Sequence, residues 1–143
     1  MTIKNSKSKN SKSKKFIFAV GRRKTAVARV RLFSGKGQMI VNGMPIEQYF
    51  PGEVAKAAWL KPFTVTDTVG KYYATIKVEG GGRSTQLGAI VHGLARALDK
   101  ENKELYHSSL KKAGFLTRDP RAKERRKPGQ MGKARKKKQS PKR

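Results

Sequence analysis

The chain has 143 residues, with 35 Lys and Arg against 9 Asp and Glu, and its formal net charge is +26. No apolar run approaches the ~20 residues that cross a bilayer, there is no cysteine for a disulfide or a thiolate zinc site, and the Lys/Ser/Asn-rich opening lacks the apolar stretch of a secretory signal. Because so large a charge repels itself unless a polyanion neutralises it, nucleic acid is the expected partner, and no membrane association is expected.

Composition divides the chain into three segments. Residues 16–117 hold 46 of the 51 hydrophobic residues, enough for one small globular domain to bury a core. Residues 1–15 are rich in Lys and Ser, and residues 118–143 carry 13 basic against 2 acidic groups. Both ends have too few apolar side chains to offset the entropy of ordering, so we expect them to be disordered when free in water.

The first part of the central segment predicts strands. Residues 16–20 form a short strand, which a cationic bend at 21–24 interrupts. Residues 25–33 alternate apolar and polar side chains, the pattern of a half-buried strand. After a Gly-rich turn at 34–37, residues 38–41 should form a strand that pairs with residues 25–33 as a hairpin. The core-facing positions of the main strand are Ala26, Ala28, Val30 and Leu32.

Helices and strands should both occur in the middle of the chain. A short helix begins at Pro45, and a second covers residues 53–60, ending before Pro62 because a proline disfavours the helical conformation of the residue before it. Residues 63–67 and 71–79 then predict two further strands. The core-facing side chains of the second are Tyr72, Ala74, Ile76 and Val78.

A long amphipathic helix is expected after the glycines at 80–82. Ser84 or Thr85 is its expected cap. A shorter helix at 109–113 should stop at Gly114, which suits a left-handed cap. Strands followed by a long helix predict an α+β domain. The apolar stripe of the long helix, which marks its extent, consists of Leu87, Ile90, Val91, Leu94 and Leu98.

The sequence offers no converging catalytic groups, so we expect no enzymatic activity, no metal and no cofactor. His92 and His107 have no cysteine and no close carboxylate at ligand spacing. Glu101 and Glu104 fit a solvated helix face better than a general acid and base. Neither a nucleophile elbow nor a zinc-protease motif is present.

Residues 80–85 join a strand to a helix, a position where free backbone N–H groups bind phosphate. The segment lacks the Gly-Lys-Ser/Thr ending of a P-loop and the spacing of a dinucleotide fingerprint, which disfavours nucleotide binding. Two alternatives stay open. One is a tight turn that needs positive φ angles, and the other, which the pattern favours, is an RNA-phosphate contact made by the loop and Arg83.

Cations also cluster at the bend and on the adjoining strand. Arg22, Arg23 and Lys24 form the bend, and Arg29 and Arg31 occupy the wet face of the main strand. A charged loop is often only solvated. Because this charge continues along one strand face, phosphate contact is the favoured interpretation.

The C-terminal segment is the most basic. It has no aromatic residue and no Leu, Ile or Val, so it has neither the apolar face of a membrane-surface helix nor side chains that stack on bases. It suits a chain that threads through folded RNA, and a nonspecific solubilising or localisation tail is the alternative. The cations expected to contact RNA are Arg118, Arg121, Arg125, Arg126, Lys127, Arg135, Lys136, Lys137 and Lys138.

Five blocks of the sequence occur in an order that one protein family shares. They are GRRKTAVARVRL (21–32), VNGMPIEQYF (41–50), GGGRSTQLGAIVHGLARAL (80–98), LKKAGFLTRDPRAKERRKPG (110–129) and KARKKKQSPKR (133–143). They closely resemble the family of small-subunit ribosomal protein nine, in its bacterial or organellar branch. The resemblance covers nearly all of residues 16–143, whereas residues 1–15 have no placed counterpart.

The resemblance implies an α+β domain of the ribosomal protein S-five domain-two-like fold, with extended basic N- and C-terminal tails. It implies a structural protein on ribosomal RNA in the head of the small subunit, beside neighbouring ribosomal proteins, in cytoplasmic or organellar ribosomes. In the family the last Lys-Arg, here Lys142 and Arg143, contacts the tRNA in the peptidyl site. The chain departs from the family at Thr85, where glycine is usual, and in ending QSPKR rather than QFSKR.

Two other functions are compatible with the charge or with the implied fold. An architectural DNA-binding protein would also use a charge of +26 and flexible arms, although no dimer seam and no groove-reading helix is recognisable. A small enzyme on the same fold would need a phosphate loop and a base, and the sequence shows neither.

Overall fold

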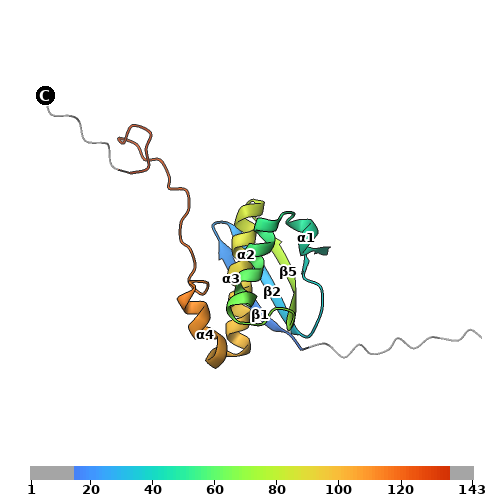
Figure 1. The fold of residues 1–143 in the computed structure, drawn as a ribbon. Helices are drawn as coiled ribbons and strands as arrows, with labels where there is room; N and C mark the ends of the chain where they lie inside the picture. Colours follow the sequence, from blue (N-terminus) through green and yellow to red (C-terminus); the bar gives the residue numbers. More distant parts are fainter. Residues whose placement is uncertain (1–14, 136–143) are drawn as a thin grey trace, which may run out of the picture.

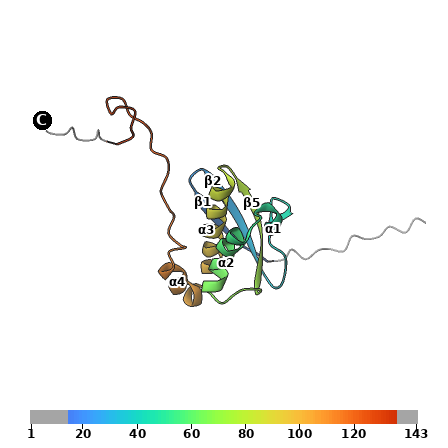
Figure 2. The same cartoon turned by 45° about the horizontal axis from the view of Figure 1, so that its top comes forward.

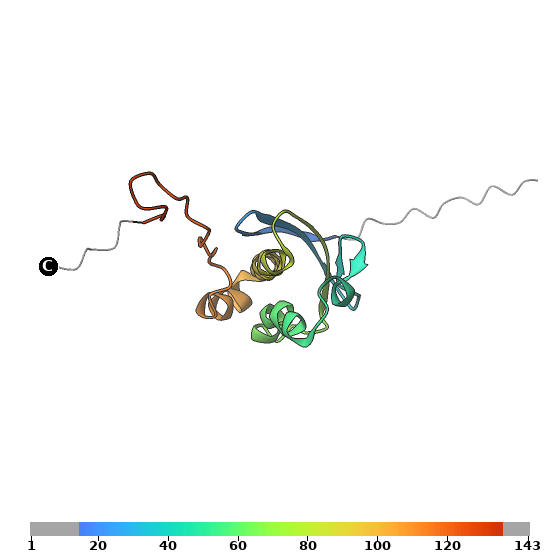
Figure 3. The ribbon, with the colours of Figure 1, turned by 90° about the horizontal axis from the view of Figure 1, so that it is seen from above.

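The computed structural model describes residues 15–135, which fold into a sheet with helices packed on one face (Figures 1 and 3). Within this range, five strands stand in the order β1-β2-β5-β3-β4. Their bounds are β1 (Ile17–Arg23), β2 (Ala26–Ser34), β3 (Ile40–Val41), β4 (Met44–Pro45) and β5 (Tyr72–Glu79). The helices are α1 (Ile46–Tyr49), α2 (Glu53–Val65), α3 (Arg83–Glu101) and α4 (Lys103–Lys112). The mixed architecture confirms the predicted α+β class.

The core lies between the sheet and α3, which packs on β1 and β2 and is flanked by α2. The predicted alternation is confirmed in β2 and β5, whose core-facing side chains are buried except for the partly exposed Tyr72. Leu87 and Val91 at the start of the α3 stripe are also only partly buried. The large side chains that are fully buried include Leu32, Ile90, Leu94, Leu98 and Leu110.

Strand β1 is longer than predicted. It continues through Arg23, and the chain turns only at the next two residues, where Lys24 has a φ of 49°. Gly21, which was expected in the bend, lies inside the strand, where its backbone packs directly on Gly93 of α3. The predicted interruption at 21–24 was therefore wrong for its first three residues.

The predicted hairpin between residues 25–33 and 38–41 does not form. β2 lies between β1 and β5, and β3 pairs in parallel with β5 instead. β5 matches β2 over eight register pairs and so buries more apolar surface against it than the two-residue β3 would. The sulfur of the buried Met39 accepts a hydrogen bond from the Ala74 backbone N at 3.1 Å, which holds the start of β3 beside β5.

Helix α2 extends beyond its predicted end. It includes Pro62 and continues for three residues into the range 63–67, where a strand was expected. Trp59, Pro62 and Phe63 are buried, and this packing outweighs the helix hydrogen bond that a proline removes. The hydroxyl of Thr66 donates to the Pro62 carbonyl at 2.9 Å and satisfies a carbonyl group of the last turn.

Helices α3 and α4 follow each other almost directly. The N-cap of α3 is Gly82 and not Ser84 or Thr85, and among the described residues no side chain makes a capping hydrogen bond at this helix start. Oδ1 of Asn102 caps α4 by accepting a backbone N–H of its first turn at 3.2 Å, so α4 begins well before the predicted residue 109. The end of α4 near Gly114, whose φ is 76°, agrees with the prediction.

After α4 the chain runs beside the helices and then extends away from the body (Figures 1 and 2). Phe115 and Leu116 still pack against the core. Residues 118–135 contain neither helix nor strand. In the described range, no helix has both the length and the apolar character needed to span a membrane.

Candidate nucleic-acid interface

Within residues 15–135 one face of the sheet has no helix on it, and this open face carries cations. Helices α2 and α3 lie on the opposite face (Figure 3). Arg29 and Arg31 are exposed on the open face, as the alternation of β2 predicted. The cross-strand pairs beside them are Phe18 with Arg31, Arg31 with Thr75, and Arg29 with Lys77.

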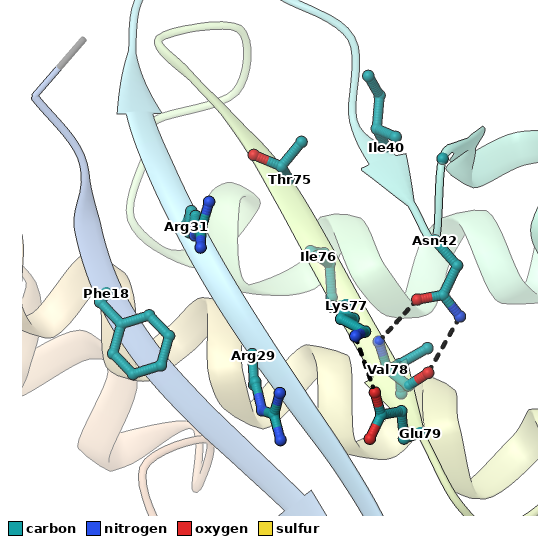
Figure 4. A pocket seen from close by; sticks show the side chains of 11 residues that line it. Phe18, Arg29, Arg31, Ile40, Asn42, Thr75, Ile76, Lys77, Val78 and Glu79 are labelled. Carbon is teal, nitrogen blue, oxygen red and sulfur yellow. Dashed lines mark hydrogen bonds and ion pairs between the residues drawn. The ribbon is translucent and has the colours of Figure 1, made fainter. Parts of the chain in front are cut away.

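These side chains line a shallow hollow of about 730 Å³, shown in Figure 4. Asn42 closes one side, because its Oδ1 accepts from the Val78 backbone N at 2.9 Å and its Nδ2 donates to the Val78 carbonyl at 3.0 Å. Lys77 Nζ lies 3.2 Å from Glu79 Oε1. Arg29 has no ion-pair partner within residues 15–135, so its guanidinium is available to an anion on this face.

An aromatic cluster borders the cationic face. Phe33 and Tyr73 stack with ring centroids 5.1 Å apart, and Phe16 lies 5.8 Å from Phe33. The Arg31 guanidinium carbon is 5.3 Å from the Phe16 ring centroid, and Phe18 is 45% exposed. Cations beside aromatic rings suit both the phosphates and the bases of single-stranded RNA. Sequence analysis missed the cluster, although the outward positions of these rings in the alternation would have indicated it.

The turn between β1 and β2 packs against the glycines before α3. A Cβ at Gly80 would lie 2.6 Å from the Thr25 carbonyl oxygen, and Gly80 and Gly81 have φ angles of 79° and 63°. This geometry supports the tight-turn interpretation of the glycine segment, and phosphate binding there stays a prediction. The exposed cations around the turn are Arg22, Lys24 and Arg83.

Ion pairs join the start of the C-terminal segment to the end of β1. Asp119 pairs with Arg121 at 2.7 Å and also with Arg23. Arg118 Nη2 donates to the Lys24 carbonyl at 3.4 Å. Hydrogen bonds from Arg121, and then from Arg23, hold the pKa of Asp119 well below its ordinary value, so the carboxylate stays charged. Arg23 and Arg121, both predicted to contact RNA, are thus already paired within the protein.

Further along the segment the cations are more accessible. Arg135 pairs with Glu124 at 2.8 Å and lowers the pKa of that carboxyl. Arg125, Arg126 and Lys127 are exposed and form no ion pair with any described residue. The other predicted RNA and tRNA contacts lie outside the described residues, namely Lys136, Lys137, Lys138, Lys142 and Arg143.

The two histidines occupy different environments. Contrary to expectation, His107 has a carboxylate partner, because its Nδ1 lies 2.7 Å from Asp99 Oδ1. This contact joins α4 to α3. No third ligand completes it, since the part of the chain described here contains no group of His, Asp and Glu that could hold a metal ion. His92 lies about two turns before Asp99 on α3, where its Nδ1 accepts a hydrogen bond from the Arg22 backbone.

Comparison with known proteins identifies the family. A family model described as ribosomal protein S9/S16 matches residues 21–143. "Small ribosomal subunit protein uS9" of Dehalococcoides mccartyi (strain ATCC BAA-2266 / KCTC 15142 / 195) is 54% identical over 114 residues, which cover 80% of this chain and 86% of the relative. "Small ribosomal subunit protein uS9" of Rickettsia felis is 49% identical over 141 residues, which cover 99% of this chain and 86% of the relative.

The family model begins at residue 21, in agreement with the lack of a placed family counterpart for residues 1–15. The alignment with the Rickettsia felis relative covers 99% of this chain and so extends into those residues. The family resemblance and the expected lack of enzymatic activity are confirmed, since both relatives are structural proteins of the small subunit. The chain therefore belongs to the ribosomal protein S9/S16 family and is a structural component of the small ribosomal subunit.

Proposed function

We propose that the chain binds ribosomal RNA in the head of the small subunit, beside neighbouring ribosomal proteins of the cytoplasmic ribosome. The observation that carries this proposal is the open sheet face, where Arg29 and Arg31 line a hollow next to aromatic rings. The relatives are named as small-subunit proteins, which supports ribosomal RNA over other polyanions as the partner.

The contacts are to phosphates more than to bases. Accessible cations are spread over the open sheet face, the turn between β1 and β2, and the segment after α4. A distribution of this kind tracks a nucleic-acid backbone, whereas sequence readout needs a few polar groups placed against base edges. The aromatic cluster at the sheet adds a surface on which an unpaired base can stack.

The C-terminal end makes a second contact, to the tRNA in the peptidyl site. This part of the proposal rests on the match of Lys142 and Arg143 to the last Lys-Arg of the family and on the extent of the family match, which reaches residue 143. The finer fold assignment, the S-five domain-two-like fold with basic tails at both ends, rests on family membership and on the α+β architecture.

Filter binding of the full chain to small-subunit ribosomal RNA over a range of salt concentrations tests the RNA contact. If about ten cations meet phosphates, the logarithm of affinity should fall with the logarithm of salt concentration with a slope of about −7 to −9. A slope of about −2 would contradict an extended phosphate interface. Equally strong binding to duplex DNA would favour an architectural DNA-binding protein instead.

A further inference from the structure

A second hollow lies at the free edge of β1 and gathers positive charge. Its volume is about 590 Å³, and it opens between β1, α3 and the segment that follows α4. Among the described residues, three arginines and one histidine line it and no carboxylate does. The lining residues are Val20, Arg22, His92, Arg96, Leu116 and Arg118.

Hydrogen bonds to backbone carbonyls hold two of the three guanidinium groups. Arg96 Nη1 donates to the Val20 carbonyl, and Arg118 Nη2 donates to the Lys24 carbonyl at 3.4 Å. A guanidinium has five N–H donors, so both groups keep donors for a ligand. The third, on Arg22, is exposed, and its side chain has no hydrogen-bond or ion-pair partner within residues 15–135.

The charge in the hollow is unbalanced. Asp119, which follows Arg118 in the chain, is paired with Arg23 and Arg121 and does not line the hollow. Three converging guanidinium groups without an acid repel one another. A phosphate neutralises such a cluster and accepts two parallel hydrogen bonds from a single guanidinium. The hollow therefore has the donors and the charge that a phosphate requires.

We propose that this hollow binds one phosphate group of the RNA backbone through Arg22, Arg96 and Arg118. The inference rests on the proposed function only for the identity of the RNA that supplies the phosphate. It adds Arg96 to the contacts, a residue that sequence analysis did not select. The guanidinium donors come from β1, α3 and the C-terminal segment. A phosphate bound to all three therefore stabilises the position of the start of that segment beside the edge of the sheet.

His92 reports the charge in the hollow. Its Nδ1 accepts from the Arg22 backbone N at 3.2 Å, and it also hydrogen-bonds to the Leu116 backbone. Burial lowers the pKa of His92 below its ordinary value, and the positive charges of Arg96 and Arg118 lower it further. The charges that act on the ring are those of Arg96 on α3 and Arg118 in the segment after α4. The ring also borders a neighbouring hollow lined by Arg22, Arg23 and Asp119, in which Asp119 is paired with Arg23. A bound phosphate offsets their charge, so the pKa of His92 should rise when the site is occupied.

The test follows the ring proton signals of both histidines in the full chain by NMR during pH titrations at constant ionic strength. Chloride alone, inorganic phosphate and a short single-stranded RNA are compared. We expect phosphate and RNA to raise the pKa of His92. The ring signals of His107, which pairs with Asp99 outside the hollow, should move much less when the ligands are added and are the internal control.

Two double variants separate the site from a general charge effect. Arg22→Gln/Arg118→Gln removes two of the three guanidiniums and should abolish the rise, while Arg96 still bonds to the β1 edge. Lys61→Gln/Lys103→Gln removes the same charge from exposed positions on α2 and α4 and should retain the rise. Urea unfolding midpoints establish that both are folded. Arg22→Gln alone should weaken the response and has no side-chain partner to lose.

The possible results differ clearly. An unchanged pKa of His92 with both phosphate and RNA would overturn the site, and so would an equal ligand-induced movement of the His107 ring signals. A response to inorganic phosphate but not to RNA would overturn the assignment to the RNA backbone. If His92 responds to both ligands while filter binding to ribosomal RNA fails the salt test, the hollow stands as a phosphate site and the proposed function fails.

Discussion

Gly21 of β1 lies directly against Gly93 of α3, backbone to backbone. A Cβ added to Gly21 would overlap the Gly93 backbone nitrogen and the carbonyl oxygen of Ala89. A Cβ added to Gly93 would lie 2.7 Å from Val30 Cγ2 and 3.1 Å from the Gly21 nitrogen. The absence of both side chains lets the helix approach the strand closely.

This approach brings one row of α3 side chains to the free edge of β1. His92, Arg96 and Lys100 recur every four residues and so share one helix face. Lys100 Nζ donates to the Phe18 carbonyl at 2.9 Å, and Arg96 donates to the Val20 carbonyl. Side chains of this row therefore form hydrogen bonds with backbone groups of β1 that would otherwise stay unpaired at the sheet edge.

We expect Gly21→Ala to destabilise the protein, because the added methyl group has no space between the two backbones. The free energy of unfolding should fall by about 1–3 kcal/mol or more, the usual cost of overpacking a core, and urea denaturation followed by circular dichroism measures it. Gly82→Ala is the control. Its Cβ would have no atom within 4 Å and its φ is −101°, so the change should be about 1 kcal/mol or less. Equal losses would contradict the contact.

Local sequence patterns were sufficient to predict the half-buried helices and strands of this fold, but they did not predict its contacts between residues far apart in the chain. The alternation in β2 and β5 and the apolar stripe of α3 depend on one solvated and one buried face, which sequence periodicity records. A glycine in a turn and a glycine pressed against a helix look alike in sequence, so Gly21 was placed in a bend. Pro62 ends a helix locally, but the burial of Trp59 and Phe63 beside it maintains α2.

The same distinction applies to the candidate site. The exposure of Arg29 and Arg31 follows from strand alternation and was predicted. Arg23 pairs with Asp119, which is far from it in the chain. No local sequence pattern indicates this pairing, so the sequence could not show that Arg23 is less available to RNA than its neighbours. Arg96 was overlooked for a related reason, because its importance depends on which strand edge lies opposite its helix face.

Arg29→Gln/Arg31→Gln should weaken binding to small-subunit ribosomal RNA without unfolding the protein, since both side chains are exposed. Each lost phosphate contact should reduce the steepness of the salt dependence by about 1, so filter binding should show a slope smaller by roughly 2. The charge-matched control is Lys61→Gln/Lys103→Gln, for which we expect a smaller change. An unchanged slope would remove these arginines from the interface, and a lost circular dichroism signal would show that their face was assigned wrongly.

Asp119→Asn should release the start of the C-terminal segment from the body, because it discharges the carboxylate that pairs with Arg23 and Arg121. We expect trypsin to cleave after Arg118 and Arg121 several-fold faster in the free protein, as followed by mass spectrometry. Glu124→Gln breaks the more distant pair with Arg135 and should leave cleavage at those two sites unchanged. Identical cleavage in Asp119→Asn and the parent would show that the ion pairs do not hold the segment.

Tyr72 should ionise at a higher pH than an ordinary tyrosine. Burial, followed by the hydrogen bond with the Tyr106 hydroxyl, raises its pKa from 10.0 to about 12. The unfolded chain therefore loses this proton first on alkaline titration, so the stability that Tyr72 contributes is present below pH 10 and is lost as the pH approaches about 12. Phenolate absorbance should show the titration of Tyr72 at this raised pH. Tyr106→Phe should lower the pKa of Tyr72, because it removes the hydrogen bond from Tyr106. Tyr49→Phe, which removes the hydroxyl bonded to Gln86, should leave the pKa of Tyr72 unchanged.

Removal of the last two residues should weaken tRNA binding in the peptidyl site and leave assembly nearly intact. Lys142 and Arg143 lie outside the described residues, and their role rests on the family resemblance. Pro141 restricts the backbone before them and so reduces the entropy lost when the end is placed. A guanidinium binds a phosphate through two parallel hydrogen bonds, so Arg143 should contribute more to the affinity for tRNA than the point charge of Lys142.

Filter binding of tRNA to purified small subunits that carry the truncated chain measures this contact. Each charged hydrogen bond contributes about 1.5–3 kcal/mol before solvent exposure weakens it, so the affinity should fall on the order of tenfold. Lys142→Gln alone, which keeps the guanidinium, should lose less than Arg143→Gln. Because many other cations remain for the proposed contacts to ribosomal RNA, we expect the amount of the protein per subunit to stay the same. Unchanged tRNA affinity at both low and physiological salt would reject the contact, and failure of the truncated chain to assemble would assign the end a structural role instead.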